Sequence, residues 1–285
     1  MIKVISAGIL SSIQDVGRYG YRDSGVPISG SMDAYAAQLA NRLLGNHQDA
    51  ALLEITLIGP VLEFREPTAI AITGAGFTPT INNREIPLNT RIWIEKGDEL
   101  RFGLAAYGLR GYLGVMGGFA TEVVLGSRSQ YTGITKSTSL KKGDLLPILS
   151  SDKVGKITTA SVKERMEHFN SKELICYKGP EFELLPKHIQ KLLETQVLEV
   201  SSKSNRMAYL LTGLEKASAE EIISAAVQPG TVQLTPSGQC IVLMRDAQTT
   251  GGYARILQLS ERAMHRLSQR RGGDHVQFRI SDLPL

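Results

Sequence analysis

"TRIWIEKGDELRFG", residues 90–103, is the stretch that decides the fold class. Its apolar side chains recur at every second position on both sides of a Lys96-Gly97-Asp98 turn: Ile92 and Ile94 before it, Leu100 and Phe102 after it. This alternation is typical of half-buried strands, and a Gly-Asp pair is typical of a tight turn. The stretch therefore predicts a β-hairpin, and most of the chain reads as similar short strands separated by Gly, Asn, Asp and Pro.

The same kind of turn occurs twice more, at Gly143-Asp144 and Gly273-Asp274, each time just before an apolar run. These recurrences favour two halves of related architecture. A polar stretch at 149–172 has little apolar periodicity and is the best candidate for a linker. We therefore expect an N-terminal β-rich domain at 1–155 and a C-terminal β-domain at 170–285.

Few helices are expected. Residues 31–44 place their apolar side chains on one helical stripe, with Ser31 as the candidate cap and Gly45 as the stop signal. Shorter helices are predicted at 184–194 and at 260–270, the latter capped by Ser260. Residues 218–227 contain a capping-box pattern but fit a strand equally well, so both possibilities stay open. The fold class is mainly β with a few helices, that is, α+β.

Composition places the chain among ordinary globular proteins. Of its 285 residues 42% are hydrophobic and 21% charged, and the net charge of +4 is scattered instead of forming a basic stripe. The sequence therefore favours neither a nucleic-acid partner nor membrane insertion. With only two cysteines and no basic, apolar leader at the N-terminus, we expect a bacterial, cytoplasmic protein.

Polar residues gather next to strong strand signals. The densest group is "MRDAQTTGGYARI", residues 244–256, which directly follows the apolar run 241–243. Fixed Arg and amide donors in glycine-rich turns suit the recognition of a carboxylate, phosphate or planar amide, and paired glycines let a ligand or another backbone approach closely. The alternative is that such residues merely form turns. That alternative is weakest at 244–256, because a plain turn needs no such set of side chains.

Common cofactor motifs are missing or incomplete. Residues 103–110 have the glycine spacing of a phosphate-binding P-loop but lack its lysine, and 73–77 lack the third glycine of a dinucleotide fingerprint. The histidines are scattered, so no metal site is predicted. No Met-Lys dipeptide of a biotin carrier occurs, so this chain is not expected to carry biotin.

The order of several motifs resembles one family closely: the C subunits of 5-oxoprolinases, or KipA-like proteins, also described as biotin-dependent carboxyltransferase or allophanate hydrolase subunit 2 proteins. The motifs that carry the resemblance are "AGILSSIQDVGRYGYRDSGVPISGSMD", "ALLEITLIGP", "AITGAG", "LRGYLGVMGGF", "VLGSRS", "SNRMAYLLTG" and "IVLMRDAQTTGGYARI". They run almost from end to end, and their combination is far more specific than any single motif.

The resemblance implies tandem cyclophilin-like β-barrels and an ATP-dependent hydrolase component that opens the lactam of 5-oxoproline to glutamate. The implied partners are a KipI-like protein and a LamB/YcsF-like protein. Because this chain lacks the P-loop lysine, we expect ATP to bind at the interface with the KipI-like partner or in a phosphate-binding loop without a recognisable motif. Two alternatives remain: a carboxyltransferase component of a biotin-dependent urea or amide carboxylase, and a non-catalytic KipA-like regulator that binds a KipI-like kinase inhibitor.

The shared chemistry of amides suggests roles for the polar residues. The candidate catalytic residues would stabilise charge or move a proton, with Asp246 acting as a general base or fixing a neighbouring arginine: Arg18, Arg245, Asp246 and Gln248. The candidate substrate-binding residues would orient the amide and the carboxylate: Gln14, Asp15, Ser127, Ser129, Asn205, Arg206, Thr249, Thr250, Gly251, Gly252 and Tyr253.

Overall fold

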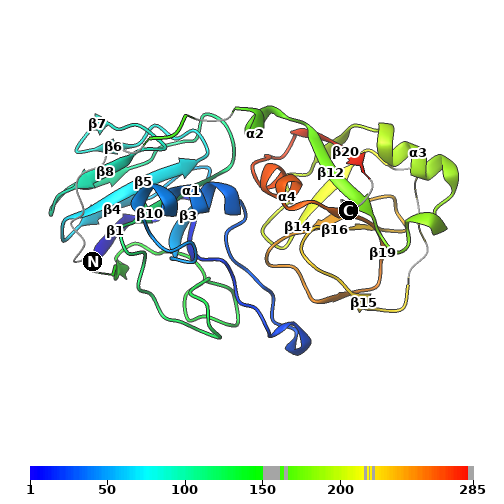
Figure 1. The fold of residues 1–285 in the computed structure, drawn as a ribbon, viewed down its shortest axis with the longest axis horizontal. Coiled ribbons are helices and arrows are strands. Elements are labelled where there is room, and N and C mark those ends of the chain that lie inside the picture. The colour runs from blue at the N-terminus through cyan, green and yellow to red at the C-terminus, as the bar shows by residue number, and fades with distance from the viewer. Residues whose placement is uncertain (150–160, 164–165, 215–216, 218, 220–221, 282–285) are drawn as a thin grey trace. The chain divides into compact units, whose positions relative to one another are not determined.

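The computed structural model describes residues 1–149, 161–163, 166–214, 217, 219 and 222–281 (Figure 1). The chain forms two compact units. The first comprises Met1–Arg18 and Ser29–Met166, and the second Tyr19–Ile28 and Glu167–Leu285. The segment Tyr19–Ile28 thus packs with the C-terminal unit, which a division into two consecutive ranges does not anticipate.

Two antiparallel sheets form the first unit. One sheet, in the order β11-β1-β4-β9-β6-β7, contains β1 (Ile2–Ser6), β4 (Val61–Phe64), β6 (Thr80–Ile81), β7 (Arg84–Glu85), β9 (Glu99–Arg101) and β11 (Leu145–Leu146). The other, in the order β2-β3-β10-β5-β8, contains β2 (Leu10–Gln14), β3 (Leu52–Thr56), β5 (Thr68–Gly74), β8 (Arg91–Ile94) and β10 (Arg110–Val115).

Strand β5, which lies between β10 and the edge strand β8, is buried along its whole length. Its side chains alternate in size: Ile70 and Ile72 belong to the core that contains residues of both sheets, whereas Ala69 and Ala71 pack with helix α1 (Ala34–Leu44). Small residues on the helical side let the helix lie close to the sheet, and large ones fill the space between the sheets. The alternation in "TAIAITG" therefore sets which face of the sheet carries α1.

Helix α1 confirms the helix predicted at 31–44, with one correction at its start. The capping residue is Asp33, whose Oδ1 accepts a hydrogen bond of 3.1 Å from the Ala36 N–H, and not Ser31. Aspartate at this position also interacts favourably with the positive end of the helix dipole. The helix ends as predicted at Gly45, which has φ +71°.

The hairpin predicted at 90–103 is wrong, although the turn and both strands exist. Strand β8 pairs with β5 in one sheet, and β9 pairs with β4 and β6 in the other. The turn thus carries the chain from one sheet to the other. Local alternation marked the strands, but their partners are set by packing against residues distant in sequence.

The three Gly-Asp turns share one hydrogen-bond pattern. In each, the aspartate Oδ2 accepts a 2.8 Å bond from the N–H three residues before it, as Asp98 does from Glu95. In each, the glycine N–H and the aspartate C=O also bond one residue of another segment: Phe64, Val4 or Val200. The glycines have φ of +91°, +94° and +90°. Two copies lie in the first unit and one in the second, so the motif recurs in both.

The second unit is a closed barrel. Its strands follow the order β12-β19-β16-β17-β14-β13-β20, with β12 and β20 as a parallel pair: β12 (Glu173–Lys178), β13 (Leu198–Val200), β14 (Ala208–Thr212), β16 (Thr231–Leu234), β17 (Cys240–Leu243), β19 (Ala254–Leu259) and β20 (His275–Ile280). Beside it lies a two-stranded sheet of β15 (Ala225–Ala226) and β18 (Thr250–Gly251).

Short helices accompany the barrel: α2 (Glu167–Asn170), α3 (Lys187–Thr195), α4 (Glu261–Ser268) and the 3-10 turns η1 (Arg22–Ser24) and η2 (Phe182–Leu184). Helices α3 and α4 confirm the two short predicted helices. Ser260 caps α4 by accepting a 3.2 Å bond from Ala263. Of 218–227, Ala225–Ala226 are strand, and both capping-box residues lie outside the described residues.

The predicted class, mainly β with few helices, is confirmed. No helix among the described residues is long and apolar enough to cross a membrane. Cys176 and Cys240 are buried free thiols, and burial raises the pKa of each to about 12. They therefore pack as small apolar residues and form no reactive thiolate at neutral pH.

Candidate functional site

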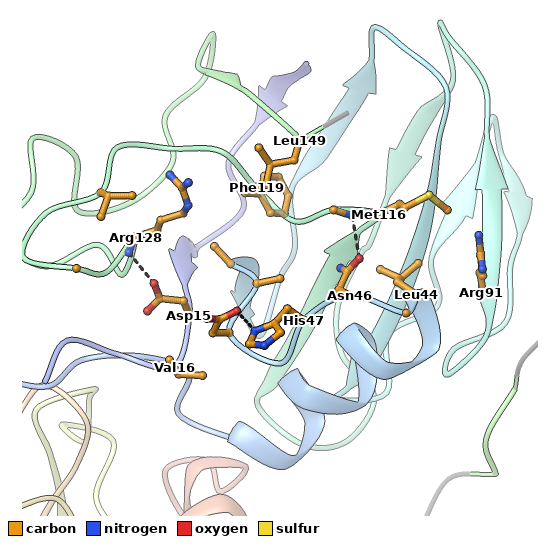
Figure 2. Close-up of a pocket in the computed structure, with 17 residues that line it drawn as sticks. Asp15, Val16, Leu44, Asn46, His47, Arg91, Met116, Phe119, Arg128 and Leu149 are labelled. Carbon is orange, nitrogen blue, oxygen red and sulfur yellow. Dashed lines mark hydrogen bonds and ion pairs between the residues drawn. The ribbon is translucent and has the colours of Figure 1, made fainter. Parts of the chain in front are cut away.

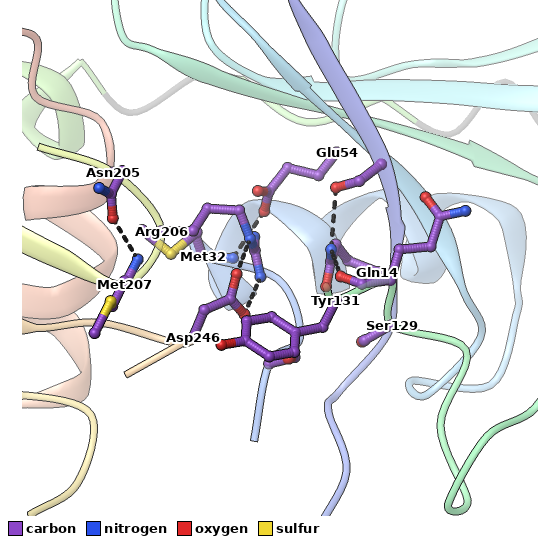
Figure 3. Close-up of polar contacts among 12 residues, drawn as sticks. Gln14, Met32, Glu54, Ser129, Tyr131, Asn205, Arg206, Met207 and Asp246 are labelled. Atoms are coloured by element: carbon purple, nitrogen blue, oxygen red, sulfur yellow. Dashed lines mark hydrogen bonds and ion pairs between the residues drawn. The ribbon is translucent and has the colours of Figure 1, made fainter. Parts of the chain in front are cut away.

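The polar stretch 244–253 folds against the 205–207 loop of the same unit. Asp246 N–H bonds the Arg206 carbonyl at 3.0 Å, and the Asp246 carboxylate holds the Arg206 guanidinium through two bonds of 2.7 and 3.1 Å (Figure 3). The side chains are only 12% and 10% exposed. Two predicted site residues 40 positions apart thus form one fixed pair.

The aspartate therefore pairs with Arg206 and not with its sequence neighbour Arg245. The guanidinium of Arg245 bonds Glu261, the first residue of α4, at 2.6 Å. His265, whose Nε2 lies 3.5 Å from the same carboxylate, and Arg245 lower the pKa of Glu261 to about 2. Arg245 thus braces the start of a helix, and Arg206 is the arginine that Asp246 orients.

The remaining predicted residues of the barrel unit have mixed surroundings. Asn205 Oδ1 accepts bonds from the N–H groups of Met207 (2.8 Å) and Ala208 (3.3 Å), so this side chain fixes a turn. Gln248 Oε1 is covered by protein and has no hydrogen-bond partner among the described residues. An acceptor left in that state costs roughly 1–3 kcal/mol. Within 244–253, the Gln248 Oε1 is therefore a buried acceptor that can take a hydrogen bond from a ligand.

The paired glycines make room for this chain's own groups. A Cβ on Gly251 would lie 2.7 Å from Nε2 of Gln233, and one on Gly252 would lie 3.5 Å from the Ile222 carbonyl. Thr250 and Gly251 pair with β15, and the Thr249 carbonyl accepts a 3.0 Å bond from Val227 N–H. Paired glycines let either a ligand or protein groups approach closely, and in this structure it is protein groups that lie beside them.

Two features of this unit escaped the sequence. Gln233, 1% exposed on β16, donates to the Tyr253 carbonyl at 3.1 Å and fills the space left by Gly251. Arg255 forms a pair with Glu181 through bonds of 3.0 and 2.7 Å. The isolated Gln in the apolar β16 sequence "TVQL" was a usable signal for the first, whereas nothing in the spacing indicated the second.

In the first unit, Asp15 gathers other predicted residues. Its Oδ1 accepts from the hydroxyls of Ser127 and Ser129, both at 2.6 Å, and from Gly17 N–H at 2.8 Å, while Oδ2 accepts from Arg128 N–H at 2.6 Å. The carboxylate thus ties the loop around 127–129 to the end of β2. Four donors on one carboxylate leave it little capacity to bind a substrate donor as well.

Arg18 and Gln14 complete this cluster. Arg18 is 1% exposed, and its Nη2 donates to the Ser129 carbonyl at 2.6 Å. Gln14 is 0% exposed and donates to Ser12 Oγ at 3.0 Å and to the Gln130 carbonyl at 3.2 Å. The structure thus brings together the predicted residues of the first unit, and it places Arg18 and Gln14 beneath the surface as supports of the loop.

Beside Asp15 lies a cavity of about 640 Å³ within the first unit (Figure 2). Arg128 and Arg91 line it from opposite sides, and between them lie Asn46 and His47, the latter paired with Asp49. The sequence offered no signal for this cavity, because its lining comes from separate loops and from the edge strand β8. Among the described residues, no group of His, Cys, Asp and Glu is arranged to hold a metal ion.

A family model described as "Carboxyltransferase domain, subdomain A and B" matches residues 24–280. The chain is 36% identical to the protein of Escherichia coli (strain K12) that is named as the C subunit of 5-oxoprolinase, over 98% of this chain and 90% of that protein. It is 29% identical to a urea amidolyase of Lachancea kluyveri, over 97% of this chain but only 17% of that protein.

Solved structures agree with these matches. TTHA0988 has a TM-score of 0.89 and 31% identity, with 98% of this chain and 55% of that chain covered. The Kluyveromyces lactis urea carboxylase has a TM-score of 0.83 and 28% identity, with 97% of this chain and 27% of that chain covered. This chain therefore spans about half of the first solved protein and a quarter of the second.

Proposed function

Because the chain belongs to the family of carboxyltransferase domains with subdomains A and B, we propose that it is the C subunit of an ATP-dependent 5-oxoprolinase. The observation that carries this proposal is the likeness in sequence: this chain is 36% identical to a protein named as that subunit, and 29% identical to a urea amidolyase. The proposed complex is a cytoplasmic hetero-oligomer with a KipI-like partner and a LamB/YcsF-like partner.

The chemistry of the reaction gives the polar residues their proposed tasks. Amide resonance resists attack by water, and transfer of the ATP γ-phosphoryl group to the lactam oxygen removes that resonance. Water then adds to the ring carbon, the C–N bond breaks as nitrogen takes a proton, and a second water hydrolyses the remaining acyl phosphate to carboxylate and phosphate. Each step develops negative charge on oxygen, which a fixed cation stabilises.

Arg206 is the cation best placed for this task in the barrel unit. Asp246 holds its guanidinium at two nitrogens, so the charge is oriented before substrate arrives, and such preorganisation costs nothing at the moment of reaction. In this scheme Asp246 is a positioning residue instead of the general base. Gln248 supplies the acceptor that a lactam N–H requires. ATP is proposed to bind at the interface with the KipI-like partner.

The test is glutamate release from 5-oxoproline by this chain mixed with its KipI-like and LamB/YcsF-like partners, with and without ATP and with this chain omitted. We expect glutamate only when all three proteins and ATP are present. Gln248→Ala should lower kcat/KM by about tenfold, the effect of one lost hydrogen bond to substrate. Gln196→Ala, which removes an exposed amide at the end of α3, is the matched control and should leave the rate unchanged.

A second candidate is the carboxyltransferase component of a biotin-dependent carboxylase, favoured by the likeness to urea amidolyase and urea carboxylase. It would take a carboxyl group from biotin carried on another chain. Glutamate release in the absence of this chain would contradict the first proposal. Carboxylation of urea that depends on an added biotin carrier would support the second.

A further inference from the structure

A pocket of about 370 Å³ lies in the second unit, apart from the cavity of Figure 2. Three cationic side chains line it: Lys178 at the end of β12, Arg255 on β19, and Arg22 from the segment that packs with this unit. Its other lining residues are apolar or neutral, and the described lining contains no carboxylate. The pocket is therefore a cationic recess in the wall of the barrel unit.

The three cations differ in how far their charge is neutralised. Arg255 pairs with Glu181 and directs Nη1 to the Ala226 carbonyl at 3.0 Å. Lys178 Nζ lies 2.8 Å from Glu183, which also binds Lys187 at 3.2 Å. Arg22 donates to the Val227 carbonyl, a neutral partner, and forms no ion pair within the part of the chain that the structure describes.

The neighbourhood consequently carries excess positive charge. Hydrogen bonds from Arg255 lower the pKa of Glu181, and those from Lys178 and Lys187 lower the pKa of Glu183, so both are ionised at neutral pH. Glu181 pairs with Arg255 and Glu183 is shared by two lysines, whereas Arg22 has a neutral partner, so the cations of this neighbourhood are only partly balanced. A phosphate group, which carries roughly −1.5 to −2 charges at pH 7, complements this positive surplus.

The geometry also suits phosphate. Guanidinium groups bind phosphate oxygens through paired N–H donors, and lysine adds a point charge. Arg22 and Arg255 both reach the pocket from fixed positions, because each is already anchored on a carbonyl of adjacent residues, Val227 and Ala226. A ligand oxygen can bind the other N–H groups of these side chains without rebuilding the site.

We propose that this pocket binds a phosphate dianion, either free or as the terminal group of a nucleotide. It adjoins the candidate site of the same unit, since Ala226 pairs with Thr250 and the Val227 N–H bonds the Thr249 carbonyl. Its assignment to the ATP or phosphate of the lactam reaction rests on the proposed function. The pocket's affinity for phosphate itself does not.

The test is calorimetric titration of the full chain, without its partner proteins, by inorganic phosphate, pyrophosphate and ATP at low ionic strength. Arg22→Gln and Lys178→Gln should each raise the Kd of the tightest probe by about tenfold, equivalent to about 1.4 kcal/mol. Lys203→Gln removes the same charge from an exposed position of the same unit that does not line the pocket, and should change Kd less than about twofold. Arg22→Lys, which keeps the charge, should recover part of the affinity.

Tighter binding of ATP and pyrophosphate than of inorganic phosphate would identify a nucleotide as the source, and equal binding would identify free phosphate; both support the site. No binding of any probe, or equal losses in the pocket and control variants, would overturn it. If the variants lose phosphate but no glutamate is ever released by the complex, the pocket stands and the proposed function fails.

Discussion

Asp15 in the first unit and Asp246 in the second are both candidate site residues, yet different partners hold them. Two hydroxyls and two backbone N–H groups surround Asp15, all neutral donors, at 2.6 to 2.8 Å. One guanidinium holds Asp246, at 2.7 and 3.1 Å. The first aspartate ties loops together, whereas the second positions a cation.

The difference matters because the two arrangements respond differently to the loss of a partner. The neutral donors around the Asp15 carboxylate are four in number, so no single one determines its stability. The Asp246 carboxylate depends on one guanidinium, and removing Arg206 leaves it buried without a counter-charge. The following changes, from the largest expected effect to the smallest, test that distinction.

Asp15→Ala should have the largest effect. It leaves two serine hydroxyls and two N–H groups without their acceptor, and we expect the free energy of unfolding to fall by on the order of 4 kcal/mol in urea denaturation. Asp23→Ala, at an exposed aspartate, is the control and should change stability by less than about 1 kcal/mol. A loss at Asp15 no greater than at Asp23 would mean that this network does not hold the loop.

Arg206→Met should cost about 3 kcal/mol, because Asp246 is then buried without a counter-charge. Adding Asp246→Leu should restore most of that stability, since two apolar side chains pack against each other and leave no charge buried without a partner. Activity of the assembled complex should stay low in both variants if Arg206 acts on the substrate. Recovery of activity together with stability would assign the pair a purely structural role.

Gly251→Ala should cost about 1–2 kcal/mol, because its Cβ would meet Nε2 of the buried Gln233 at 2.7 Å. The neighbouring Gly252→Ala is a matched control: its Cβ would lie 3.5 Å from the nearest atom, an ordinary contact, and we expect almost no loss of thermal stability. Equal losses for the two variants would contradict this account of the glycine pair.

Glu261→Gln should have the smallest effect, below about 1 kcal/mol, because solvent screens the Glu261 carboxylate, whose side chain is 66% exposed although that of Arg245 is 11% exposed. The pKa of Glu261 is lowered in the folded state to about 2 from 4.5, so its contribution is complete above pH 4.5 and disappears as pH falls toward 2. Unfolding measured across that range should show the two proteins converging at the acidic end. A difference in the free energy of unfolding between the two proteins that grows as the pH falls would contradict this prediction.

The accuracy of the sequence predictions followed the range of the interactions involved. The bounds of α1 were nearly right, because Asp33 and Gly45 act within one helical turn. The hairpin at 90–103 was wrong, because alternation shows that a strand has one apolar face but not which strand lies beside it.

The candidate site divides in the same way. The unusual polarity of 244–253 was visible in the sequence, and so was the serine-rich loop around 127–129. That Asp246 would bind Arg206, that Asp15 would bind Ser127, and that Arg22 would join the barrel unit were not visible. These contacts join residues from 40 to more than 100 positions apart, and the intervening chain contains no spacing rule that selects them.

By itself, the sequence determined the mainly β class, the positions of α1, α3 and α4 but not of α2, the Gly-Asp turns and the order of motifs that matches a family, because each depends on neighbouring residues. Only the tertiary structure decided which strands pair, how Arg206 is oriented, that Gln233 lies beside Gly251, and which cations line the pocket of the second unit. These features require side chains from distant segments to meet, and the energy that selects one meeting over another comes from packing and desolvation of the whole unit.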